Sequence, residues 1–197
     1  MSPVPIERER IVEAALAIIR EGGWAAVSAR AIAARLGAST MPIYSAVGSM
    51  AELKGAAAAR AAELLAAAQR VRRTGDEILD LAVGYVAFAR EEPRLFRFIG
   101  EAQGGPEGRA ATEESLEEQL ATGAPGVASP ALRSLLAEFA DPARRKDFVF
   151  RSWVFTHGLA EMLVSGLVAM DDAEIARQLG AAGGAFYTYD QEQGGQS

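Results

Sequence analysis

A pair of side chains in the C-terminal part of the sequence has the residue types and the spacing for acid–base chemistry. His157, the single His, stands four residues before Glu161, so on a helix the imidazole and the carboxylate would share one face. The absence of Cys excludes disulfides, thiol nucleophiles and thiolate metal sites, and this pair offers too few ligands for a metal. We therefore expect no metal and no cofactor. An enzyme that uses His157 is the unfavoured alternative, because no nucleophile or phosphate loop accompanies the pair.

His157 allows three interpretations. The first is a core histidine with satisfied hydrogen bonds. The others, in decreasing order, are a hydrogen bond to a ligand and a pH-sensitive contact at an interface.

A second group of polar side chains lies near the N-terminus and could bind phosphate. The segment from Ser39 to Ser45 carries hydroxyl groups and one aromatic ring, and hydroxyls donate hydrogen bonds to phosphate oxygens. Residues 1–60 contain seven basic and five acidic side chains, whereas the whole chain has a net charge of -6. This asymmetry suggests that a polyanion would dock at the N-terminal end. Judged by charge alone, the favoured explanation of this basic excess is that the charged side chains only keep the protein soluble.

The elements that must position these groups are helices. Ala, Leu, Glu and Arg dominate, and no stretch alternates apolar and polar residues long enough to predict a strand, so we expect an all-α fold. The most apolar stretch, residues 153–170, contains charge, and the N-terminus is charged as well, so we expect a soluble, cytoplasmic chain with no membrane span. The predicted helices cover residues 7–20, 29–36, 40–46, 50–70, 76–92, 94–102, 109–122, 129–140, 142–169 and 172–189.

Capping residues organise the first part of the chain into a helix–turn–helix unit. Ser28 is a good N-cap, and Gly37 suits the left-handed position that ends the short helix after it. Ser39 can cap the next helix, but Pro42 has no N–H, so the Ser39 side chain must accept from the N–H of Met41. Ser49 with Glu52 forms a capping box for a longer helix. Two short helices packed on a longer first helix make a helix–turn–helix unit, and its second short helix would fit the major groove of DNA. Three helices that only form a small core are the alternative.

The same stretch resembles the N-terminal domain of the tetracycline-repressor (TetR) family. The resemblance covers about residues 7–54 and rests on Arg10-Ile11-Val12, Val27 to Ala33, Leu36 to Ser39, Ile43-Tyr44 and Ser49 to Leu53. It implies a homodimeric transcriptional regulator, usually a repressor, that binds a double-stranded DNA operator and a small molecule. The residues that it nominates for DNA contact are Ser28, Arg30, Ser39, Thr40, Met41, Tyr44, Ser45 and Ser49.

Two features depart from the family pattern. Tyr44 is followed by Ser45, Ala46 and Val47 rather than by further aromatic residues, and Met50 stands where the family has a Lys. Loss of a phosphate contact predicts weaker operator binding and a log–log salt slope smaller by about 0.9. A dimeric helical adaptor that has lost DNA affinity is therefore the alternative function.

The C-terminal part resembles a TetR subgroup named for its Trp and His-Gly residues, through residues 89–98 and Trp153 to Leu159. We expect a helix–turn–helix domain over residues 1–50, a larger ligand-binding and dimerisation domain over 51–189, and a disordered tail over 190–197. In this family type, dimerisation through about residues 153–187 would form a four-helix bundle. A largely apolar ligand could contact residues that are otherwise simple core: Phe88, Phe96, Phe98, Phe139, Phe148, Phe155, His157 and Met162.

Overall fold

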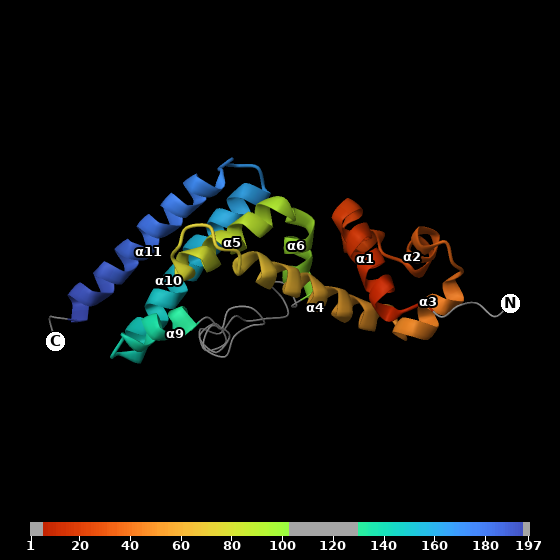
Figure 1. The fold of residues 1–197 in the computed structure, drawn as a ribbon, viewed down its shortest axis with the longest axis horizontal. Helices are drawn as coiled ribbons and strands as arrows, with labels where there is room; N and C mark the ends of the chain where they lie inside the picture. The colour runs from red at the N-terminus through yellow and green to blue at the C-terminus, as the bar shows by residue number, and fades with distance from the viewer. Residues whose placement is uncertain (1–5, 103–129, 195–197) are drawn as a thin grey trace. The chain divides into compact units, whose positions relative to one another are not determined.

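The computed structural model describes residues 6–102 and 130–194, and every regular element in these ranges is a helix (Figure 1). The all-α prediction is confirmed. The elements are α1 (Arg8–Gly22), the 3-10 turn η1 (Trp24–Ala26), α2 (Ala29–Leu36), α3 (Thr40–Val47), α4 (Met50–Gln69), α5 (Glu77–Glu91), α6 (Pro93–Ala102), α9 (Pro130–Ala137), α10 (Pro142–Val164) and α11 (Asp172–Gly194). The helix predicted over residues 109–122 lies outside the described residues. No helix within the described ranges is long and apolar enough to cross a membrane.

Two predicted helix ends were wrong. The helix α10 ends at Val164 rather than near residue 169, because Gly166 adopts a φ of 76° and the N–H of Leu167 bonds to the carbonyl of Met162. The helix α11 continues to Gly194, so residues 190–194 are not the expected disordered tail. Asp190 is buried there and accepts a hydrogen bond from Arg151 of α10, which stabilises the last turns of α11.

The chain divides into two compact units. The N-terminal unit contains the described residues up to Leu64 together with residues 92–102, and the C-terminal unit contains residues 65–91 and 130–194. The division therefore differs from the expected boundary at residue 50. The reason is that the first part of α4 packs with the N-terminal helices, where Leu53, Ala57 and Ala61 are fully buried.

The core of the N-terminal unit is built on α1. Its apolar stripe is buried, with Ile11 and Ile19 fully excluded from solvent. The helix α6 also packs against α1. The Arg94 guanidinium donates to the carbonyl of Arg20 at 2.8 Å, and the Arg20 side chain pairs with Glu92 at 2.9 Å. These contacts satisfy a carbonyl in the last turn of α1 and attach α6 to the end of α1.

The C-terminal unit is formed mainly by α5, α10 and α11, which pack against one another. The last turn of α4 crosses α5 at Gly84, where an added Cβ would lie 2.5 Å from the carbonyl oxygen of Ala68. The backbones of the two helices are therefore in contact, and only glycine permits this approach. In the first turn of α5, the buried carboxylate of Asp80 accepts hydrogen bonds from the N–H groups of Arg73 and Thr74 and fixes the turn between α4 and α5.

Candidate functional site

The two short helices α2 and α3 form the predicted helix–turn–helix, and local caps set their limits. The Ser28 side chain accepts a hydrogen bond from the N–H of Ala31 at 3.1 Å, which confirms the predicted N-cap of α2. Gly37 ends α2 with φ 64° and ψ 36°, and the N–H of Ala38 bonds back to the carbonyl of Ala33. This left-handed turn directs the chain into α3 within three residues, so the second helix begins beside the first.

The expected side-chain cap of α3 was wrong. Ser39 is the N-cap residue, but its side chain makes no capping hydrogen bond. Pro42 occupies the third helical position and has no N–H, so the usual partner of a serine cap is missing. The Ser39 hydroxyl is exposed and is not used by its own helix.

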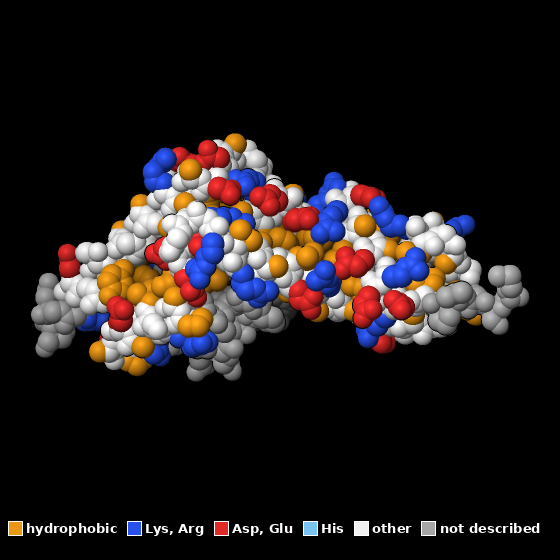
Figure 2. Space-filling model, in the orientation of Figure 1, with side chains coloured by type: hydrophobic (Ala, Val, Ile, Leu, Met, Phe, Trp, Pro, Cys, Tyr) orange, Lys and Arg blue, Asp and Glu red, His pale blue; other side chains and the backbone are white. Residues whose placement is uncertain are grey.

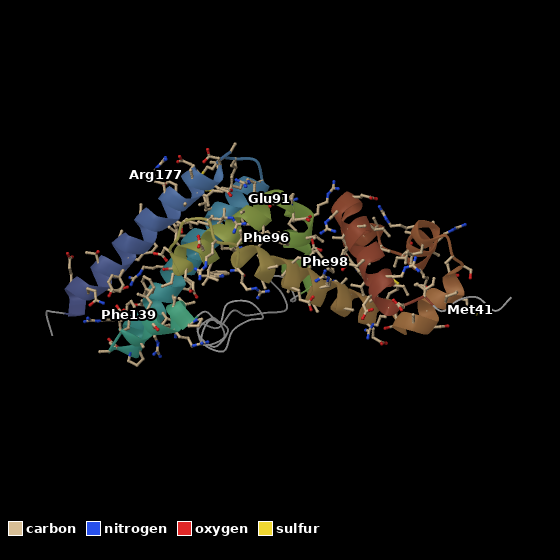
Figure 3. All side chains as sticks on the ribbon, viewed as in Figure 1. Met41, Glu91, Phe96, Phe98, Phe139 and Arg177 are labelled. Atoms are coloured by element: carbon tan, nitrogen blue, oxygen red, sulfur yellow. The ribbon has the colours of Figure 1, made fainter. Side chains whose placement is uncertain are left out.

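The helix α3 has one buried side and one open side. Ile43 and Val47 are almost completely buried, whereas Met41 is 75% exposed and Tyr44 is 50% exposed. Figure 3 places Met41 on α3 at the surface of the unit. The other predicted contacts that are exposed are Ser28, Arg30, Ser39, Thr40 and Ser45. The structure thus leaves these side chains accessible on neighbouring elements, and contact with DNA remains a prediction for each of them.

Ser49 differs from the other predicted contacts, because its hydroxyl already acts as both a donor and an acceptor of hydrogen bonds within the protein. It accepts from the N–H of Glu52 at 3.1 Å, which confirms the cap of α4, and it donates to the Glu52 carboxylate at 3.0 Å. The half-buried Ser49 would have to break this pair to donate to a phosphate.

Ion pairs neutralise part of the basic surface of the N-terminal unit. Arg35 pairs with Glu21 and holds the pKa of that carboxyl below its usual value through their hydrogen bond. Arg60 pairs with Glu13, and Figure 2 shows acidic and basic side chains intermixed over this unit. Among the arginines of α1 and α2, Arg20 and Arg35 are paired with carboxylates, whereas Arg8, Arg10 and Arg30 have no carboxylate partner among the described residues.

Comparison with known proteins identifies this arrangement. A sequence family described as "Bacterial regulatory proteins, tetR family" matches residues 11–57, and one described as "Tetracyclin repressor-like, C-terminal domain" matches residues 78–181. The second match alone spans more than half of the chain. The chain belongs to the TetR family. It is a transcriptional regulator with a DNA-binding helix–turn–helix, as the N-terminal motifs predicted.

Individual proteins resemble this chain in sequence or in fold. An uncharacterized HTH-type transcriptional regulator of Mycobacterium tuberculosis is 28% identical, over 87% of this chain and 76% of its own length. A TetR-like transcriptional regulator from Rhodococcus sp. RHA1 has a similar fold, with a TM-score of 0.55, 17% identity and coverage of 93% of this chain and 96% of its own. A putative TetR-family regulator from Mesorhizobium loti has a TM-score of 0.53 at 17% identity, covering 92% and 95% of the two chains.

The aromatic side chains predicted to line a ligand cavity are distributed over both units of this TetR-family chain. Phe96 and Phe98 lie on α6 in the N-terminal unit, where Phe98 stacks on Trp24 with ring centroids 5.4 Å apart. The remaining predicted residues belong to the C-terminal unit: Phe88, Phe139, Phe148, Phe155, His157 and Met162.

Within the C-terminal unit the predicted residues do not gather in one place. Phe139 and Phe148 are buried together, with ring centroids 5.0 Å apart, and the ring of Tyr187 stands edge-on to both. Phe155 is 36% exposed and Met162 is 42% exposed. Phe88 is buried in α5. Binding of a ligand by these residues stays a prediction.

His157 lies in a small aromatic and polar cluster that sequence reasoning only partly found. Its ring stacks on Trp153, with centroids 5.0 Å apart and an interplanar angle of 4°, and its Nε2 lies 3.9 Å from a Glu161 oxygen. The predicted shared face of His157 and Glu161 is therefore confirmed. The sequence analysis missed Tyr85, whose hydroxyl reaches Nδ1 of His157 at 2.9 Å. No local signal could have found it, because Tyr85 is 72 residues away on α5.

Proposed function

We propose that this TetR-family regulator is a homodimeric repressor that binds a near-palindromic operator and leaves it when a small, largely apolar molecule binds. The observation that carries the proposal is the open side of α3, with Met41 and Tyr44 exposed opposite the buried Ile43 and Val47. A helix of this size fits the major groove, which is about 12 Å wide.

The surface of α10 and α11 supports the dimer. Phe150 and Val154 are one turn apart on α10 and are 45% and 46% exposed, which is unusual for large apolar side chains. The exposed residues in the middle of α11 are small and would permit close approach of a second helix: Gly180, Ala181, Gly184 and Ala185. Helices with an unused apolar face commonly pair across a two-fold axis. Such a dimer would present two α3 helices to half-sites about 34–36 Å apart.

A ligand could regulate binding only through different affinities for the DNA-bound and free conformations. The helix α6 supports this part of the proposal. Its Arg94 and Phe98 attach it to the end of α1 and to Trp24, so a change in the position of α6 would reach the helix–turn–helix core.

The test begins with duplexes retained by the protein from a random DNA library. Fluorescence anisotropy then measures their affinity for the natural chain, for Tyr44→Ala and for Arg30→Ala. We expect each variant to bind at least about tenfold more weakly, from the loss of a phosphate or base contact in both half-sites. The matched control is Arg70→Ala, which removes an exposed cation of the C-terminal unit and should bind normally.

Undiminished binding by both N-terminal variants would remove this surface from the proposal. If the protein retains no duplex at all, the dimeric adaptor replaces the repressor as the proposed function.

A further inference from the structure

The helix α3 has an unusual set of side chains for reading DNA. It contains no charged residue and no Asn or Gln. Bidentate recognition of guanine uses Arg or Lys, and bidentate recognition of adenine uses Asn or Gln. The side chains of α3 therefore cannot form the bidentate hydrogen bonds that give the strongest discrimination among bases.

The hydroxyl groups of α3 can supply little base recognition in place of these bidentate hydrogen bonds. The Ser45 hydroxyl donates to the carbonyl of Met41 at 3.1 Å, so its hydrogen is already committed within the helix. Tyr44 lies one turn from the start of α3 and is half exposed. Thr40 is the remaining exposed hydroxyl of α3, and a Ser or Thr hydroxyl discriminates poorly among bases.

Met41 is the most exposed large group on this surface. It is the second residue of α3 and is 75% exposed, although an unbranched thioether gains nothing from contact with water. In a helix–turn–helix, the N-terminal residues of the second helix approach the base edges. The apolar group that a base pair presents in the major groove is the C5-methyl of thymine.

We propose that Met41 reads thymine through its C5-methyl group, so that each operator half-site carries an essential thymine opposite the start of α3. This inference rests on the proposed DNA-binding function and specifies the bases that the same surface selects. The flexible Met side chain can follow the methyl group without the fixed geometry that a hydrogen bond would need. Specificity at this base pair then comes from apolar burial rather than from hydrogen bonding.

The experiment removes single methyl groups from the DNA. In duplexes retained from the random library, each thymine is replaced in turn by deoxyuridine, which lacks only the C5-methyl. Anisotropy measures the affinity for the natural chain, for Met41→Ala and for a control, Val71→Ala, which shortens an exposed apolar side chain of the C-terminal unit.

We expect one thymine in each half-site at which deoxyuridine weakens binding about fourfold, the effect of losing one buried methyl group. Met41→Ala should bind thymine and uracil equally at that position, whereas Val71→Ala should still discriminate. Cytosine at the same position should also weaken binding, and 5-methylcytosine should recover part of the loss.

Two results would overturn the inference while leaving DNA binding intact. One is a natural chain that tolerates deoxyuridine at every position. The other is a Met41→Ala variant with the same sensitivity to deoxyuridine as the natural chain. A protein that retains no duplex contradicts the proposed function itself and the inference with it, so the two failures are distinguishable.

Discussion

The hydroxyl of Tyr85 on α5 lies 2.9 Å from Nδ1 of His157 on α10. Burial raises the pKa of the Tyr85 hydroxyl well above its usual value, and the negative charge of Glu161 raises it further. Tyr85 therefore keeps its proton throughout the physiological range, and its hydroxyl is hydrogen-bonded to Nδ1 of the imidazole. The other nitrogen faces Glu161, so His157 links the carboxylate on its own helix to the tyrosine on α5.

Replacement of Tyr85 by Phe should change the alkaline unfolding of the protein. Above about pH 10 the unfolded chain releases the tyrosine proton while the folded chain keeps it, so stability falls with rising pH by up to about 1.4 kcal/mol per pH unit. Tyr85→Phe removes this contribution, and its free energy of unfolding should fall less steeply between pH 10 and 11. Urea unfolding at several pH values measures the slopes. The control is the exposed Tyr44→Phe, and parallel curves for Tyr85→Phe and the natural chain would contradict the expectation.

Asp80 should stabilise the fold only while its carboxyl is charged. Burial raises the pKa of Asp80, but hydrogen bonds from Thr74 and Arg73 outweigh burial and hold that pKa below its ordinary value of 3.8. Stability from this group is therefore present above about pH 4 and is lost as the pH falls further. We expect Asp80→Asn to lower the free energy of unfolding by about 1–3 kcal/mol at pH 7, with a smaller difference at pH 3. Urea unfolding at both pH values tests this, with the exposed Glu101→Gln as control, and an equal loss at both would show that the charge is unimportant.

The N-terminal unit was the most predictable part of the structure, because its signals are local. Ser28, Gly37 and Ser49 each act on residues within four positions, and all three end or begin a helix as predicted. Ser39 shows the limit of such reasoning. The sequence indicates that Pro42 removes one N–H partner and leaves the N–H of Met41, but the Ser39 side chain bonds to neither.

The C-terminal unit was less predictable, because its contacts join distant helices. An apolar pattern shows that Phe98 and Phe148 are buried but does not identify their partners, and the structure places them in different units. The pairing of Tyr85 with His157 depends on how α5 crosses α10, which no residue spacing encodes. Membership of the family could be read from motifs, whereas the arrangement of candidate ligand residues required coordinates.

Gly84 should be far more sensitive to substitution than another helical glycine, Gly55. A Cβ at Gly84 would lie 2.5 Å from the Ala68 oxygen and the Gln69 Cα, so α4 and α5 would have to separate. We expect Gly84→Ala to lower the free energy of unfolding by about 1–3 kcal/mol. Gly55→Ala meets nothing within 4 Å and should raise it by about 0.5–1 kcal/mol, through its better helix propensity. Chemical unfolding of both variants makes the comparison, and equal stabilities would disprove close contact between the helices.

The proposed dimer makes Val154 a position where one charge should separate two subunits without unfolding either. Val154 is 46% exposed on α10, so a glutamate there can remain hydrated in the monomer. In a dimer formed through this face, however, the same carboxylate would lose its water without gaining a partner. We expect Val154→Glu to raise the dimer dissociation constant at least about a hundredfold, roughly 3 kcal/mol.

Sedimentation equilibrium measures this constant, and circular dichroism checks that the variant remains folded. Val71→Glu places the same charge on an apolar residue that is 48% exposed outside α10 and α11, and it should leave the dimer intact. A monomeric Val154→Glu should also lose most of its affinity for a duplex with two half-sites, because each α3 then binds alone. If Val154→Glu stays dimeric at low protein concentration, the exposed face of α10 is not the interface, and the spacing of the two α3 helices must be set elsewhere.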